Sequence, residues 1–188
     1  MMSQSDTLKN QLLIAMPTLE DPNFSRTVTY ICEHSDQGAM GIVLNRPTEL
    51  SLADVLRHMD IEGGLGDAGG QIVFLGGPVE EERGFVLHSH TAPWASTLAV
   101  NDVISVTTSR DILEAMARGD GPTHTLVALG YAGWGAGQLE RELQDNAWLS
   151  GPADQSILFE LPPDQRWEAA ARLLGVDVNL LSSEAGHA

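Results

Sequence analysis

The chain has 188 residues, of which 43% are apolar and 19% charged, so its length and composition are those of one globular domain. Twenty-six acidic residues against ten basic ones give a formal net charge of −16, and Lys9 is the single lysine. Binding to DNA and to anionic membranes draws on clustered Lys and Arg, so the composition argues against both. Because Cys32 is the single cysteine, an internal disulfide and a cysteine-based zinc site are excluded.

The two ends of the chain are small and polar, and this predicts one domain over residues 11–181 with frayed ends at 1–10 and 182–188. The N-terminus has no basic region, and its apolar run Leu12–Met16 is too short for a signal sequence or a membrane span. These features predict a soluble protein of the cytoplasm.

Eight short apolar or β-branched runs, each bounded by Gly, Pro, Asn or Asp, predict strands. In chain order they are Gln11–Ala15, Thr27–Glu33, Ala39–Asn45, Gln71–Leu75, Gly84–His88, Val103–Thr107, Thr125–Tyr131 and Ser156–Glu160. The connection His34–Gly38 is short and contains Asp36 and Gly38, which predicts a hairpin between the second and third strands.

Four helices are predicted between these strands. Their ranges are Leu52–Met59, Arg110–Arg118, Gly137–Ala147 and Gln165–Leu174, with Ser51 and Ser109 as expected N-caps and Gly119 and Gly175 as expected ends. The resulting order, β-β-β-α-β-β-β-α-β-α-β-α, mixes hairpins with crossovers. It predicts an α/β fold of the mixed α+β type, in which a mixed sheet is flanked by about four helices.

Three motifs have a functional and a structural interpretation. The glycine-rich stretch Gly130–Gly137 lies between a predicted strand and a predicted helix, a position where an anion can bind. It lacks the Lys and Ser/Thr of a phosphate loop, however. The structural interpretation is a sharp turn with Trp134 packed over it. His88 and His90 share a strand face, yet no further metal ligand stands at a recognisable spacing. Cys32 lies in an apolar run, which favours a buried, unreactive thiol over a nucleophile.

The sequence Asn45-Arg46-Pro47 places an amide and a guanidinium at the end of a predicted strand, and Arg26 stands near the start of another. Arginine is the side chain best suited to bidentate recognition of carboxylate or phosphate. The alternative is that these arginines form structural ion pairs, for which the chain has many carboxylates.

Six segments together resemble the YqgE/AlgH family of bacterial proteins. They are Leu13–Pro17, Asp21–His34, Gly38–Pro47, Phe74–Val79, Arg83–Ser89 and Leu129–Glu142, with Asn146 and Trp148 beyond the last. The resemblance implies a single mixed α/β domain with a small, partly barrel-like sheet surrounded by helices. The family carries the label of transcriptional regulator from an association with alginate production. It has no agreed enzymatic reaction, so no catalytic residue can be carried over.

These observations leave three hypotheses. The leading one is a cytoplasmic binding or regulatory module that acts through a protein partner or a small anionic ligand, without a cofactor or metal. The alternative is a small-molecule enzyme, and a direct DNA-binding regulator is a third hypothesis, against which the charge and the lack of a helix-turn-helix motif argue. The candidate pocket or binding residues in the first two cases are Arg26, Asn45, Arg46, His88 and Trp134.

Overall fold

The structure is a computed structural model that describes residues 7–63, 69–89 and 94–177. Its strands are β1 (Gln11–Ala15), β2 (Val28–Ser35), β3 (Gly38–Val43), β4 (Pro47–Ser51), β5 (Ile72–Leu75), β6 (Val79–Ser89), β7 (Thr97–Ala99), β8 (Ile104–Thr107), β9 (Thr125–Gly135) and β10 (Trp148–Pro152). Its α-helices are α1 (Leu52–His58), α2 (Arg110–Arg118), α3 (Gln138–Gln144) and α4 (Pro163–Leu173), and a π-helical turn spans Ser156–Glu160.

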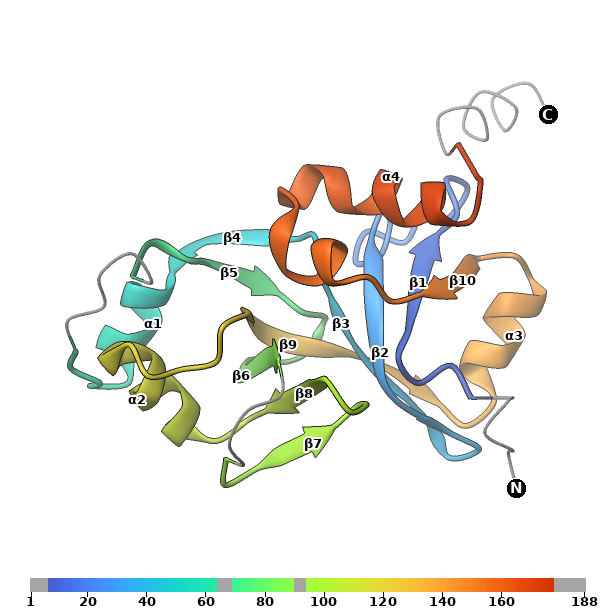
Figure 1. The fold of residues 1–188 in the computed structure, drawn as a ribbon. Coiled ribbons are helices and arrows are strands. Elements are labelled where there is room, and N and C mark those ends of the chain that lie inside the picture. Colours follow the sequence, from blue (N-terminus) through green and yellow to red (C-terminus); the bar gives the residue numbers. More distant parts are fainter. Residues whose placement is uncertain (1–6, 64–68, 90–93, 178–188) are drawn as a thin grey trace.

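The ten strands form one curled sheet in the order β10-β1-β2-β3-β9-β6-β8-β7, to which β4 and β5 are attached through β9 (Figure 1). The strands pair antiparallel, apart from the parallel pair of β5 and β9. The sheet curls into a half-barrel, with helix α4 across β1 and β2, helix α3 at one end and helices α1 and α2 at the other. This architecture confirms the predicted mixed α+β fold with a partly barrel-like sheet and flanking helices.

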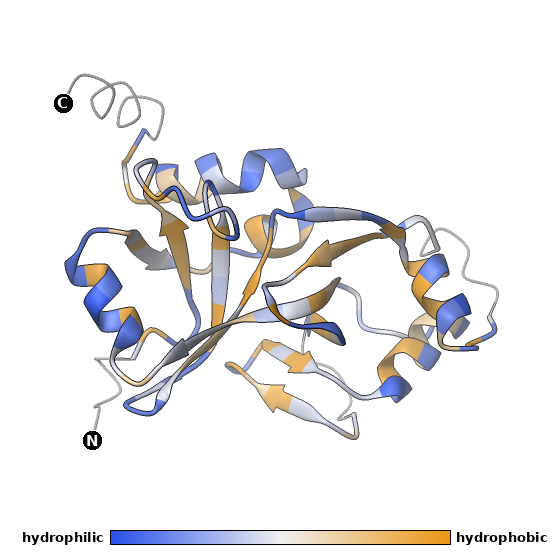
Figure 2. Ribbon diagram, turned by 180° about the vertical axis from the view of Figure 1, so that it is seen from behind, coloured by the Kyte–Doolittle hydropathy of each residue, from blue (hydrophilic) through white to orange (hydrophobic). Residues whose placement is uncertain are grey.

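The apolar residues form three clusters, one under each group of helices. The largest lies between the sheet and α4, the second under α1 and α2, and the third under α3. Figure 2 shows hydrophobic residues along many of the strands and hydrophilic residues on the outer faces of the helices. The burial of one apolar stripe per helix is what holds these short helices in place.

The predicted hairpin of β2 and β3 is confirmed, with Tyr30 opposite Ile42 and Ser35 opposite Gly38. Strand β9 connects this hairpin to the rest of the sheet. Its first half lies between β5 and β6, and its second half pairs with β3. The change of neighbour occurs at Gly130, which has φ +76°.

Two backbone segments touch at this crossing. A Cβ on Gly130 would lie 2.5 Å from the carbonyl oxygen of Gly77, and a Cβ on Gly77 would lie 2.1 Å from the carbonyl carbon of Tyr131. No side chain fits between the two segments. The glycine-rich stretch is therefore mostly strand, and it needs glycine here for close backbone contact.

Several predicted elements differ from the structure. Ser156–Glu160 was predicted as a strand and is a helical turn, because the Asp154 carboxylate accepts hydrogen bonds from the backbone N–H groups of Ser156 and Ile157. A five-residue apolar run does not distinguish a strand from a buried helical turn. Strands β4, β7 and β10 were not predicted, since β4 and β7 are largely exposed and β10 contains both Gly and Pro.

The predicted helix ends agree more closely. Ser51 caps α1 and forms a capping box with Asp54, and Gly119 ends α2 with φ +83°. Ser109 has the backbone conformation of an N-cap, but its hydroxyl accepts a hydrogen bond from the Ser96 backbone N–H instead of one in its own helix. Helix α4 begins earlier than predicted, since Pro163 occupies its first turn.

The expected frayed N-terminus, residues 1–10, overlaps the described residues at 7–10, and these four residues contact β2. The backbone N–H of Asn10 donates to the carbonyl of Ile31, and that of Leu8 donates to Nδ1 of His34. Residues 182–188, expected to be frayed as well, lie outside the described residues. No helix in the described ranges is long and apolar enough to cross a membrane.

Candidate functional site

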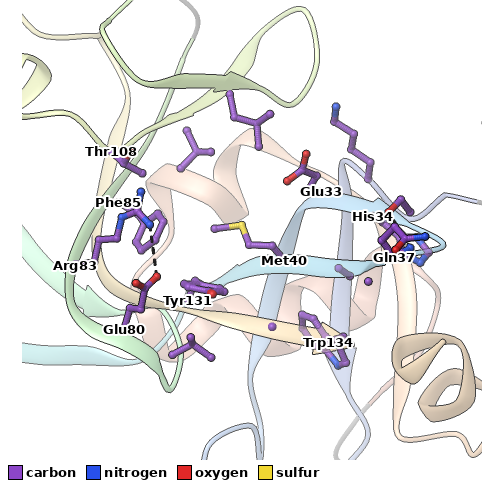
Figure 3. A pocket seen from close by; sticks show the side chains of 18 of the residues that line it. Glu33, His34, Gln37, Met40, Glu80, Arg83, Phe85, Thr108, Tyr131 and Trp134 are labelled. Carbon is purple, nitrogen blue, oxygen red and sulfur yellow. Dashed lines mark hydrogen bonds and ion pairs between the residues drawn. The ribbon is translucent and has the colours of Figure 1, made fainter. Parts of the chain in front are cut away.

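A large open groove lies where the half-barrel fails to close, and we call it the hairpin groove (Figure 3). Its volume is about 1130 Å³. One wall is the outer end of the β2–β3 hairpin, and the opposite wall is β7 together with the end of β8. Strands β6 and β9 form the bottom between them.

The floor of the hairpin groove is apolar. Met40 of β3, Phe85 of β6, Leu98 of β7 and Tyr131 of β9 line it, and the ring of Phe85 meets that of Tyr131 edge-on at 5.6 Å between centroids. Gly133 follows Tyr131 on the same face of β9 and leaves the floor open beside that ring. A concave site with an apolar floor and few polar groups is the usual form of a binding site for a ligand or a peptide.

The rim is polar and carries charges of both signs. Lys9 and Glu33 lie at the hairpin side, and Glu80 and Arg83 lie where β6 bulges away from β9. The Arg83 guanidinium lies 3.5 Å from a Glu80 carboxylate oxygen and 5.3 Å from the centre of the Phe85 ring. Strand β6 therefore contributes an ion pair to the rim and an aromatic ring to the floor.

The hairpin wall is fixed from behind by His34. Its Nδ1 accepts a hydrogen bond from the Leu8 backbone N–H at 2.8 Å, which places the ring proton on Nε2, and Nε2 donates to the Glu140 carboxylate of α3 at 3.3 Å. Its side chain is 1% exposed. This histidine therefore joins the N-terminal segment, the hairpin and α3, and both of its nitrogens are used in doing so.

Trp134 belongs to the same wall. The indole N–H groups of Trp134 and Trp148 both donate to one carboxylate oxygen of Glu142, at 3.1 and 2.9 Å, and the Gln138 side chain donates to the other. Phe24 packs against both indole rings. Glu142 is thus an acceptor for three neutral donors, and it holds the Trp134 ring in the cluster under α3, behind the groove wall to which Trp134 belongs.

The structure places three of the proposed site residues at the opposite end of β3. The Asn45 side chain accepts from the Val28 N–H and donates to the Arg26 carbonyl, and the Arg46 guanidinium donates to the Ser25 carbonyl at 2.7 Å. The Arg26 guanidinium lies 5.5 Å above the centre of the Trp167 ring. These side chains hold the loop before β2, and none of the three lines the hairpin groove.

A further arginine lies close to this loop. Arg166 of α4 is buried, donates to the carbonyls of Leu44, Leu158 and Leu161, and lies against the Phe74 ring. Burial lowers the pKa of its guanidinium to about 10. Among the described residues, Arg26, Arg46 and Arg166 have no carboxylate within 4.0 Å, so the alternative of structural ion pairs does not describe them.

His88, the fourth proposed site residue, is buried in β6. Its Nδ1 donates to the Ser89 carbonyl at 2.8 Å, and its Nε2 accepts from the Thr107 hydroxyl at 2.7 Å. His90 lies outside the described residues. In the described ranges, no three side chains of His, Cys, Asp or Glu come close enough together to hold a metal ion.

Cys32 has no exposed surface, and burial raises the pKa of its thiol to about 12. The expected burial of the thiol is confirmed, and its lack of reactivity stays a prediction. Of the five proposed site residues, only Trp134 lies on the hairpin groove, and no pattern in the sequence distinguishes Met40, Phe85 or Tyr131 as site residues. Their grouping depends on the curl of the sheet, which a sequence pattern does not show.

A second cavity of about 950 Å³ lies between α1, α2 and the sheet. Its walls include Val55 and Leu113 of the two helices and Leu129 of β9. Gly84 of β6 opens into it, because a Cβ on this residue would meet no atom within 4 Å. This cavity serves below as the comparison for the hairpin groove.

Comparison with known proteins finds relatives along the whole chain. A UPF0301 protein of Thioalkalivibrio sulfidiphilus is 64% identical over the full length of both chains, and one of Methylococcus capsulatus is 56% identical over the same extent. The solution structure of the AlgH protein from Pseudomonas aeruginosa is similar with a TM-score of 0.81 and 50% identity, covering both chains completely. The crystal structure of a protein from Corynebacterium diphtheriae shares the fold, with a TM-score of 0.75 and 19% identity over 96% of this chain and 94% of that one.

A family model described as AlgH-like matches residues 12–179. This range takes in every strand from β2 to β10, all four α-helices and most of β1. The chain belongs to the AlgH-like family of UPF0301 proteins.

Proposed function

We propose that this protein is a cytoplasmic binding module that holds a ligand or a partner protein in the hairpin groove and acts in regulation through that complex. The observation that carries the proposal is the groove itself, an apolar floor of four side chains with one wall fixed by His34 and Trp134. Rigid walls around an apolar floor support binding, because little order is lost when the ligand enters.

The polar groups near the groove favour binding over catalysis. His34 uses both ring nitrogens in structural hydrogen bonds, and the carboxylates of Glu140 and Glu142 are turned toward His34 and the two indoles. A general base or nucleophile must instead reach the substrate with an available atom. We therefore place the enzyme hypothesis second.

A groove-blocking variant tests the proposal. In Gly133→Leu the new Cβ meets the Tyr131 ring at 3.4 Å, an ordinary contact, and the leucine side chain occupies the floor. The matched control is Gly84→Leu, also a strand glycine with space around its Cβ, which opens into the second cavity. Neither glycine has a positive φ.

The measurement is a pull-down from native lysate of the source bacterium, with mass spectrometry of retained proteins and metabolites. We expect a component that the wild-type protein and Gly84→Leu retain and that Gly133→Leu loses. Retention by Gly133→Leu at the wild-type level, with the variant folded, would remove the groove as the binding site.

A further inference from the structure

The geometry points to one class of occupant: we infer that the hairpin groove binds an extended, basic segment of a partner protein, which adds to β7 as a further strand. This inference rests on the proposed function and names its partner. The argument uses the backbone of β7, the floor next to it and the charges around the rim.

Strand β7 has an open edge. Its pairing with β8 is flanked by two backbone hydrogen bonds, from the Thr108 N–H to the Ser96 carbonyl and from the Val100 N–H to the Ile104 carbonyl. In an antiparallel pair, alternate residues face the partner strand, so Leu98 faces β8 and the backbone groups of Thr97 and Ala99 point away from it. Within the described part of the chain, β7 pairs with β8 alone.

This open edge borders the groove. Three consecutive residues, Ser96, Thr97 and Leu98, line the groove, although successive side chains of a strand point to opposite faces. By the register of β7 and β8, Ser96 and Leu98 share one face with Thr108 and Val106, which also line the groove, so the groove lies over this face and reaches the open edge of β7 at Thr97. The backbone N–H and C=O groups of Thr97 and Ala99 are therefore available to an incoming strand.

The floor suits the side chains of such a strand. An added strand would direct every second side chain inward, toward Met40, Phe85 and Tyr131. Leu98 already does so from β7, because it is half-buried and packs against the main apolar cluster. Strand addition obtains affinity from backbone hydrogen bonds and selectivity from alternate side chains, and the groove offers both.

The charges select a basic partner. Glu33 and Glu80 lie on the rim together with Lys9 and Arg83, and Glu81 and Glu82 add two carboxylates on the neighbouring bulge of β6, outside the groove lining. The whole chain has a net charge of −16. A segment with Lys or Arg at its outward positions would be attracted over distance and would meet carboxylates at the rim, whereas an acidic segment would be repelled.

The test uses a pool of blocked heptapeptides with Lys at positions 1, 3, 5 and 7 and Val, Ile, Leu or Phe at the other three. The backbone groups of an added strand alternate in direction, so those that face β7 belong to one set of alternate residues. Two N-methylated forms of the pool, one methylated at the Lys residues and one at the apolar residues, therefore separate strand addition from simple apolar contact. A fourth pool replaces Lys by Glu.

The readout is backbone NMR of the full-length protein. We expect the basic pool to bind, to slow hydrogen exchange at the amides of Thr97 and Ala99, and to lose at least about tenfold in affinity on one pattern of N-methylation but not on the other. The acidic pool should bind at least about tenfold more weakly. Gly133→Leu should abolish binding, and Gly84→Leu should leave it unchanged.

Other outcomes overturn the inference. Failure of the basic pool to bind, equal tolerance of both methylation patterns, or equal binding of the acidic pool would each contradict it. In that case the pull-down decides the fate of the proposed function. If Gly133→Leu loses a lysate component that the wild-type protein retains, the groove is a binding site for a ligand of another class, such as a small molecule, and only this inference falls. If Gly133→Leu retains that component, the proposed function falls as well.

Discussion

The two walls of the hairpin groove are built in different ways. On the hairpin side, His34 and Glu142 connect the wall to α3 and to the N-terminal segment, and the aromatic rings of Phe24 and Trp148 support it. On the opposite side, β7 has three residues, pairs with one strand and leaves the backbone groups of alternate residues unbonded by β8.

Because the two walls differ in this way, we expect them to have different roles in binding. In the hairpin wall, the polar side-chain atoms of His34 and Trp134 are hydrogen-bonded inside the protein, so the wall provides a fixed surface against which a ligand can pack. Within the described residues, no strand pairs with the outer edge of β7, and an open strand edge is a site where natural proteins either bind a partner or risk unwanted pairing. Fixed apolar surface and open backbone edge together define a peptide site.

The largest expected effect concerns Cys32, which lies in β2 behind the hairpin wall. Because its thiol is buried and its pKa is raised to about 12, it reacts only when the structure opens. We expect labelling by iodoacetamide at neutral pH to be at least about a thousandfold slower in the native protein than in urea, as for groups that require substantial unfolding. Rapid stoichiometric labelling of the native protein would mean that this wall opens locally.

The raised pKa of the Cys32 thiol predicts that the stability of the folded protein depends on pH. The pKa of the thiol is higher in the folded protein than the ordinary value of 9.0, so its contribution to stability is fully present below about pH 9 and is lost as the pH rises toward 12. Urea melts at several pH values should show this loss, and Cys32→Ala should reduce it.

The next largest effect is expected for Glu142→Ala. The substitution removes the acceptor of two indole N–H groups and one amide, and we expect it to lower the free energy of unfolding by about 2–4 kcal/mol in urea melts. Glu142→Gln keeps one acceptor oxygen and should lose less than half as much. Equal losses in the two variants would show that the carboxylate charge, and not its hydrogen bonds, supports the wall.

Arg46→Ala tests whether the far end of β3 is a second binding site. The Arg46 guanidinium makes one hydrogen bond to the Ser25 carbonyl, so we expect Arg46→Ala to lose no more than about 1 kcal/mol of stability. Asn45→Ala should lose more, because the Asn45 side chain hydrogen-bonds to two backbone groups. If Arg46 binds an anionic ligand, Arg46→Ala should lose a metabolite or partner that Gly133→Leu retains. A large fall in melting temperature with all components retained would make Arg46 structural.

The smallest expected effect is in DNA binding, where we expect no selective binding at all. With a net charge of −16 and one lysine, the protein should give no sequence-selective shift in a mobility-shift titration with genomic fragments at about 150 mM salt. Selective retention at about 10⁻⁸ M would show that direct recognition of DNA occurs despite the charge.

Local signals in the sequence accounted for much of the fold. The hairpin of β2 and β3, the cap at Ser51 and the end of α2 at Gly119 all follow from residues next to each other in the chain. The run Ser156–Glu160 was misassigned because its helical form depends on Asp154, whose cap outweighs the strand propensity of the apolar residues. Strand β7 was missed because a strand of three residues is too short to show an alternating pattern.

The groove could not be predicted in the same way. Asn45, Arg46 and Trp134 were selected from one strand end and one glycine-rich stretch, but β3 is long enough to carry Arg46 to the other side of the hairpin from Trp134. Trp134 borders the groove but its ring packs on the other face of β9, under α3, and Met40 and Tyr131 are ordinary apolar residues in the sequence. Only the curl of the sheet brings these residues opposite β7.

The account's central claim is that the open edge of β7 binds an added strand, and Ala99→Pro tests it most directly. The N–H of Ala99 points away from β8, so proline removes a hydrogen-bond donor from the open edge while the pairing with β8 is kept, and stability should change by no more than about 1 kcal/mol. With Ala99→Val as the control, we expect the affinity for the basic heptapeptide pool to fall at least about tenfold in Ala99→Pro and to stay unchanged in the valine variant. Wild-type affinity in a folded Ala99→Pro protein would contradict strand addition at β7.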